Sequence, residues 1–150
     1  LSSTFAMFRG HNQVKSRSEQ KLEQLIKALE RDPEDILTIL NLGEIGDPQA
    51  TDPLMKILQG NYRDDTREFA AYALGNIGDP GANGPLGAVA LDKNEQYLLR
   101  ETAVSALGKI GDSQAIKLLI KIYEENEFDK LGDSAAGVLR ELGIHSYYGL

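Results

Sequence analysis

The chain has 150 residues, the size of one domain, and 23 acidic residues against 16 Lys and Arg give it a net charge of −7. This balance argues against nucleic-acid binding, because proteins that bind nucleic acids normally carry a basic face. The sequence has no Cys, which excludes disulfides and thiolate chemistry, and its two His residues, His11 and His145, leave little for a metal cluster or a catalytic triad. There is neither an apolar run of the roughly 18 residues that cross a bilayer nor a secretory pattern, so we expect a soluble protein of the cytoplasm.

Residues 1–15 stand outside the regular pattern of the remaining chain, and they include the apolar residues Phe5, Met7 and Phe8. We expect an N-terminal arm here, and two forms of it remain open. The arm is either a mobile or vector-derived extension, or a segment that packs back onto the rest of the chain or onto a second chain.

Apolar residues recur at helical spacing through the rest of the chain. The first run predicts a helix near 17–30, where Ser16 and Glu19 have the spacing of a capping box. A second helix is predicted near 33–43. The same spacing continues in pairs of runs as far as Leu142, so we expect eight helices in four antiparallel pairs and no strands.

One motif closes each predicted pair and opens the next. The pattern Leu-Gly-x-Ile-Gly-Asp starts at Leu42, Leu74 and Leu107, and a shortened copy starts at Leu142, with spacings of 32, 33 and 35 residues. The second Gly suits the left-handed position that ends a helix, and the Asp suits the N-cap of the next one. The predicted N-caps are Asp47, Asp79 and Asp112, with Asp32 before Pro33 as an earlier example of the same device.

Two features of the predicted pairs bear on their packing. Pro53 and Pro85 lie six residues after a capping Asp, which predicts a kink in the first helix of their repeats. A single pair cannot bury its apolar face alone, so neighbouring pairs should stack.

The predicted fold is an all-α superhelix of four antiparallel helix pairs. It forms one domain over 16–150, with repeats at about 16–46, 47–78, 79–111 and 112–145.

The string Arg-x-x-Ala-x-x-Ala-Leu-Gly-x-Ile-Gly-Asp stands at 67–79 and returns at 100–112. It resembles the HEAT repeat, and within it the HEAT-like subtype of phycobilisome (PBS) lyases. The resemblance covers about 17–145, and Asp35 and Ala135 depart from it where Arg would stand. It implies a right-handed solenoid, and its members range from phycobilin attachment factors to generic scaffolds.

In stacks of this kind an Arg at the motif position commonly pairs with Asp residues of the turns between helices. The resemblance therefore implies a structural ladder in which Arg67 and Arg100 pair with Asp47, Asp79 or Asp112 and link neighbouring repeats. The alternative is an Arg cluster that holds an anionic ligand.

Catalytic, metal and cofactor sites are not expected. Deoxyhypusine hydroxylase also resembles this repeat and binds iron through His-Glu pairs, but Glu68-Phe69 and Glu101-Thr102 stand at those positions here. No Gly-Lys-Ser/Thr string follows the glycines, so they do not form a phosphate loop. The carboxylates are spread over helix surfaces without a sign of a buried pair.

Binding to another protein is the function class that remains. Stacked repeats form an extended concave surface, usually from the second helix of each pair. Tyr and Arg are frequent anchors of interfaces, and the acidic balance favours a partner with a basic patch. The sequence thus predicts a non-catalytic scaffold or adaptor. Its predicted partner-binding residues are Glu68, Tyr72, Tyr97, Glu101, Ser105 and Arg140.

The first repeat has Ile36 and Leu40 where the second has Glu68 and Tyr72. A terminal repeat is expected to be polar on its outer face. We therefore expect these two residues to be covered by the N-terminal arm, by self-association with a second chain, or by another part of a longer protein. The aromatic end at 144–150 is expected to cap the last repeat or to bind a partner.

The alternative function is a phycobilin lyase-type subunit or a bilin-handling chaperone, as the resemblance implies. Such a protein would hold a tetrapyrrole in the same concavity. Arg67, Arg100 and Arg140 are then the candidates for binding its propionates. An enzyme is the less favoured interpretation, because no nucleophile stands out.

Overall fold

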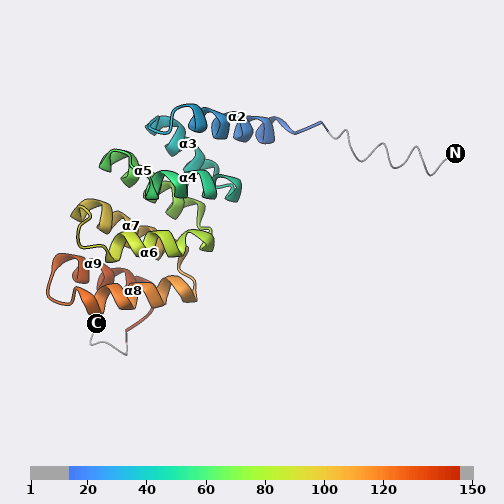
Figure 1. Cartoon of the computed structure of the whole chain (residues 1–150). Coiled ribbons are helices and arrows are strands. Elements are labelled where there is room, and N and C mark those ends of the chain that lie inside the picture. The colour runs from blue at the N-terminus through green and yellow to red at the C-terminus, as the bar shows by residue number, and fades with distance from the viewer. Residues whose placement is uncertain (1–13, 146–150) are drawn as a thin grey trace.

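The computed structural model describes residues 14–145, which form eight α-helices stacked as four antiparallel pairs (Figure 1). The predicted all-α superhelix is confirmed. Most of the predicted arm, with Phe5, Met7 and Phe8, and residues 146–150 of the aromatic end lie outside the described residues. The helices are α2 (Arg17–Arg31), α3 (Ile36–Ile45), α4 (Thr51–Gln59), α5 (Asp64–Ile77), α6 (Asn83–Leu91), α7 (Tyr97–Ile110), α8 (Ser113–Glu125) and α9 (Lys130–Glu141), with 3₁₀ turns η1 (Pro48–Ala50) and η2 (Pro80–Ala82).

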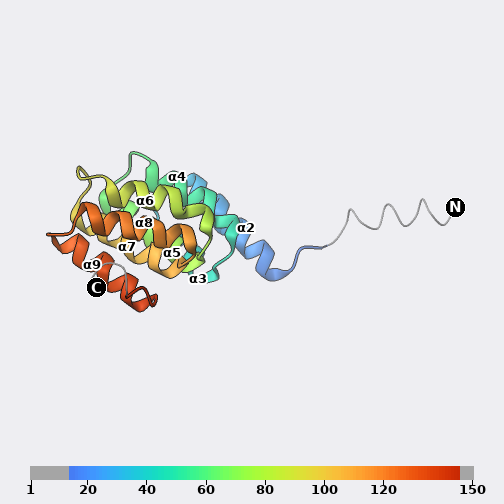
Figure 2. The same ribbon diagram turned by 90° about the horizontal axis from the view of Figure 1, so that it is seen from below.

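The pairs build two layers. The first helices, α2, α4, α6 and α8, contact one another in what we call the A layer, and the second helices, α3, α5, α7 and α9, contact one another in the B layer. Figure 2 looks along the stack and shows α4, α6 and α8 superposed on one side of α5 and α7. Apolar side chains between the layers are fully buried, among them Leu54, Leu58, Leu74, Leu86, Leu107, Leu119 and Leu139.

The first pair begins as predicted and continues differently. Ser16 and Glu19 form the expected capping box at the start of α2. The predicted cap of the second helix is wrong: Asp32 ends α2, and Asp35 caps α3. Asp35 is the cap because its carboxylate accepts hydrogen bonds from the Leu37 backbone N–H at 3.2 Å and from the Thr38 hydroxyl at 2.6 Å.

The repeated motif turns the chain between pairs as predicted. Its second glycine takes a left-handed conformation in each of the three complete copies, with φ of 71° at Gly46, 74° at Gly78 and 63° at Gly111. The carboxylate of each following Asp accepts a backbone N–H of the next element at 2.9 Å. These confirmed N-caps are Asp47, Asp79 and Asp112.

The predicted proline kinks take another form. Pro53 and Pro85 are the third residues of α4 and α6, where a backbone N–H has no partner within the helix. The prolines therefore cost these helices no hydrogen bond. The irregular stretch is the 3₁₀ turn, η1 or η2, that precedes each helix.

The first glycine of the motif lets neighbouring B-layer helices approach closely. A Cβ on Gly43 of α3 would lie 2.9 Å from Cα of Ala73 in α5. Likewise, a Cβ on Gly75 of α5 would lie 2.8 Å from Cα of Ala106 in α7. Real Cβ atoms do not approach backbone atoms this closely, so the stacking distance of the repeats depends on these glycines.

Candidate functional site

A shallow groove of about 450 Å³ crosses the B layer over α5, α7 and α9. Its charged lining residues are Glu101 and Glu141, and both are acidic, so the groove carries negative charge. The complete lining is Tyr72, Glu101, Thr102, Val104, Ser105, Ser134, Gly137, Val138 and Glu141.

Glu101 is the most firmly held of the groove residues. Its Oε1 accepts a hydrogen bond from the Tyr97 hydroxyl at 3.0 Å and another from the Ser134 hydroxyl at 3.0 Å. The first donor lies one turn earlier on α7, and the second lies on α9. The carboxylate thus joins two repeats and is fixed in position before any partner arrives.

The phenol of Tyr97 stays a hydrogen-bond donor over the ordinary pH range. Partial burial raises its pKa, and the neighbouring Glu101 carboxylate adds to the rise because it disfavours a phenolate beside it. The Tyr97 hydroxyl therefore keeps the proton that it donates to Glu101.

Tyr72 forms one wall of the groove and is 45% exposed. The ammonium of Lys109 lies 4.3 Å from the centre of its ring and also donates to the Asn76 side-chain oxygen at 2.8 Å. This cation–π contact between α7 and α5 holds the aromatic side chain in place. The exposed part of the ring remains available for contact with a partner.

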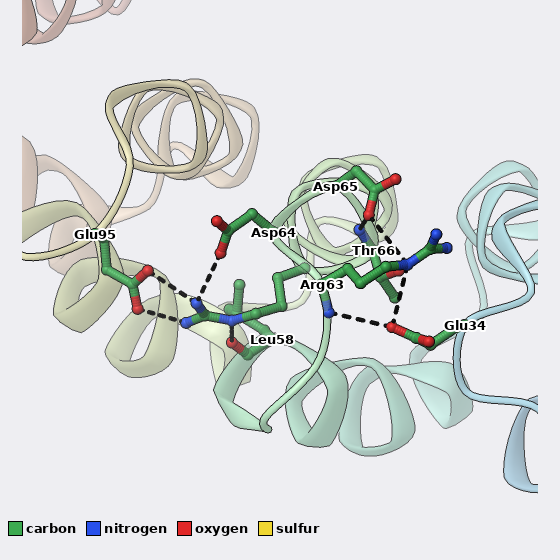
Figure 3. Close-up of polar contacts among 8 residues, drawn as sticks. Glu34, Leu58, Arg63, Asp64, Asp65, Thr66 and Glu95 are labelled. Atoms are coloured by element: carbon green, nitrogen blue, oxygen red, sulfur yellow. Dashed lines mark hydrogen bonds and ion pairs between the residues drawn. The ribbon is translucent and has the colours of Figure 1, made fainter.

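A second set of polar contacts joins the repeats at the edge where the loops within the pairs lie. The guanidinium of Arg67 makes two hydrogen bonds to the Glu95 carboxylate of the following pair, one of them at 2.8 Å. It also donates to the Leu58 carbonyl at 2.9 Å and lies 3.7 Å from Asp64 (Figure 3). The hydrogen bonds that Arg67 donates to Glu95 raise the pKa of Arg67, against the opposing effect of burial.

Arg100 occupies the equivalent position on α7 and is buried. Its guanidinium donates to the Ala90 carbonyl at 2.9 Å and to the side-chain oxygen of Asn126 at 3.1 Å. Asn126 precedes α9, so this contact again reaches the following pair. Both of these hydrogen-bond partners are uncharged.

The comparisons with known proteins agree with this architecture. The family model of HEAT repeats matches residues 20–97 and, in a second overlapping match, residues 54–140. The chain belongs to the HEAT-repeat family. No curated protein matches the chain. HEAT repeats commonly serve as protein-interaction scaffolds.

The partners expected for the HEAT-repeat arginines are wrong. Arg67 pairs with Glu95 and Arg100 with Asn126, whereas the turn residues Asp47, Asp79 and Asp112 are N-caps. The physical reason is that each turn carboxylate already accepts a backbone N–H at the opposite end of the pair from the Arg. Of the three, Asp112 also links two HEAT repeats, because it accepts a hydrogen bond from the Asn83 amide of α6 at 2.9 Å.

The groove collects only part of the predicted partner-binding set. Tyr72, Glu101 and Ser105 line it, and Tyr97 is bonded to Glu101. Glu68 lies one helical turn before Tyr72 on α5, outside the lining. Arg140 is exposed on α9 but does not line the groove. Sequence reasoning missed these lining residues: Thr102, Val104, Ser134, Gly137, Val138 and Glu141.

The error at α9 has a geometric cause. Sequence comparison aligned the motifs, whose last spacing is 35 residues, and so matched Arg140 with Ser105. In the regular repeats the first Gly of the motif meets a residue two positions before the next copy's Gly, whereas Gly108 meets Val138, five positions before Gly143. Because one residue turns a helix by about 100°, Glu141 lines the groove while its neighbour Arg140 does not, although a guanidinium nitrogen of Arg140 lies 4.0 Å from where a Cβ on the lining residue Gly137 would be. The longer last spacing was the available signal that α9 has its own register.

Residues 14–145 offer no candidate for a metal site or for a membrane span. Within this part of the chain no group of three or more His, Asp or Glu side chains could hold a metal ion. Over the same residues no helix combines the length and the apolar character that a membrane span requires.

Proposed function

We propose that the chain is a non-catalytic scaffold or adaptor of the cytoplasm that binds another protein in the groove of the B layer. The observation that carries this proposal is the Glu101 carboxylate. It is held by Tyr97 and Ser134 in the lining of a groove whose charged lining residues are acidic. A surface ordered before binding loses less conformational freedom when its partner arrives.

The chemistry of the groove favours a partner segment with basic side chains. Glu101 and Glu141 line it from two neighbouring helices, and a Lys or Arg placed between them would be attracted by both. Two positive charges of this chain lie beside the groove: Lys109 is engaged by the Tyr72 ring and by Asn76, and the Arg140 guanidinium lies near Gly137 of the lining. Complementary charge of this kind speeds encounter and selects among partners.

The bilin alternative has less support. The motif at 67–79 still resembles the PBS lyase subtype, and we keep that kinship as part of the proposal. A tetrapyrrole, however, would need arginines in the concavity for its propionates. Arg67 and Arg100 are engaged at the loop edge by Glu95 and Asn126, which leaves Arg140 as the one of the three candidates that lies beside the groove.

Charge reversal in the groove should abolish partner binding. We expect the double variant Glu101→Lys/Glu141→Lys to lose the proteins that the unchanged chain retains from a native lysate. Both side chains lie at the surface of the B layer, so the variant should keep its fold, which circular dichroism checks. The measurement is quantitative comparison of the proteins retained on the two immobilised chains.

The matched control is Asp52→Lys/Glu124→Lys, which makes the same charge change on exposed positions of the A layer, in α4 and α8. This control should retain the same partner as the unchanged chain. If all three chains retain the same proteins in the same amounts, the groove is not the binding site and the proposal fails.

A further inference from the structure

The helix α3 at the N-terminal end of the B layer is apolar almost all round. Six of its ten residues are Ile or Leu. A helix of this composition is normally buried on every side. Among the described residues α3 packs against α2 and α5, and Leu37 is left 67% exposed and Ile45 41% exposed.

The exposed side of α3 corresponds to a buried side of the next repeat. Aligning Leu42 with Leu74 places Leu37, Asn41 and Ile45 at the positions of Phe69, Ala73 and Ile77. On α5 these three residues form one stripe. Ala73 in that stripe meets Gly43 of the preceding helix, and Phe69 and Ile77 pack against the buried core. We call Leu37, Asn41 and Ile45 the α3 stripe. It is a surface built to face a preceding B-layer segment.

We propose that the segment 1–13 of this chain covers the α3 stripe, with Phe5, Met7 and Phe8 as its contact residues. The argument is topological. In the interior of the stack, the segment that leads directly into an A-layer helix is the one that packs on the next B-layer helix: α3 leads into α4 and packs on α5, and α5 leads into α6 and packs on α7. The segment that leads into α2 is residues 1–13.

The distances allow this contact. Because α2 and α3 contact each other and run antiparallel, the start of α2, which segment 1–13 precedes, lies toward the end of α3 that carries Ile45 (Figure 1). The six residues from Phe8 to Val14 can span about 20 Å when extended. The α3 stripe runs from Leu37 to Ile45, eight helical steps that rise about 12 Å along the helix axis. The reach of the extended segment thus exceeds the length of the stripe.

The absence of Cys makes the contact directly measurable in the full chain. A nitroxide label attached through Arg9→Cys should erase the NMR methyl signals of Leu37 and Ile45, and reduction of the label should restore them. The same label attached through Lys117→Cys, on exposed α8, should leave both signals unchanged.

A mixed sample separates this proposal from self-association. Spin-labelled chains without isotope are combined with isotope-labelled chains that carry no Cys. Both methyl signals should persist in the mixture. Loss of the two methyl signals in the mixture would mean that a second copy covers the stripe. Persistence of the signals when the label is on the same chain would mean that segment 1–13 does not cover the stripe. Either result overturns the proposal.

A second measurement tests the energetic consequence. Phe5→Ser/Phe8→Ser should speed hydrogen exchange of the α3 amides about tenfold, because α3 loses its cover, while the amides of α7 stay unchanged. Equal exchange of α3 in the two chains would contradict the proposal. The groove lies over α5, α7 and α9, so this outcome is independent of partner binding there.

Discussion

Replacing Gly75 by alanine is expected to lower the free energy of unfolding by about 1 to 2 kcal/mol. The new Cβ would lie 2.8 Å from Cα and 2.9 Å from Cβ of Ala106, so α5 and α7 must move apart. Overpacking of this kind costs about 1 to 3 kcal/mol, and the better helix propensity of alanine returns about 0.5 to 1 kcal/mol. Urea unfolding followed by circular dichroism measures the difference.

The matched control is Gly137→Ala in α9, where a new Cβ would approach only the end of the flexible Arg140 side chain, at 4.0 Å. The same chemical change should there stabilise the protein slightly, by about 0.5 kcal/mol, because alanine restricts the unfolded chain. If the two substitutions change the free energy of unfolding in opposite directions, close packing of α5 and α7 is the cause of the destabilisation at Gly75. A neutral or stabilising effect of Gly75→Ala would show that the stacking distance does not depend on the first glycine of the motif.

Breaking the Arg67–Glu95 pair from either side is expected to cost about 2 to 3 kcal/mol. Only 13% of the Arg67 side chain and 19% of the Glu95 side chain are exposed, so either one left alone is a poorly solvated charge. The double variant Arg67→Met/Glu95→Gln should cost less than the sum of the single variants, by about 1 to 2 kcal/mol. The measurement is a double-mutant cycle of urea unfolding.

The pair of Lys27 and Glu23 on α2 serves as the comparison. These side chains lie 3.0 Å apart but are 65% and 40% exposed, so the same cycle should give no measurable coupling. Strict additivity at Arg67 and Glu95 would contradict their assignment as a link between HEAT repeats.

The features that the sequence predicted well depend on nearby residues. The capping box of Ser16 and the N-caps at Asp47, Asp79 and Asp112 each involve residues at most three positions apart. Periodicity likewise predicted the helices and their pairing. The fold could therefore be predicted almost completely from spacing.

The features that were missed depend on contacts between repeats. Whether Arg67 binds a turn Asp or Glu95, 28 residues later, depends on which loop the stacking brings within reach. The α9 wall of the groove depends on where Gly108 meets Val138. Motif spacing gives the equivalent residues of two repeats and does not give their contacts.

The most direct test of a groove that receives a basic side chain is an NMR titration with two short peptides. One carries a single arginine, and the other carries citrulline, which has nearly the same shape and no charge. We predict that only the arginine peptide shifts the amide signals of Tyr72, Glu101, Ser105, Ser134, Gly137 and Glu141, and that added salt weakens the effect. Equal shifts with both peptides, or shifts confined to the A layer, would contradict the account.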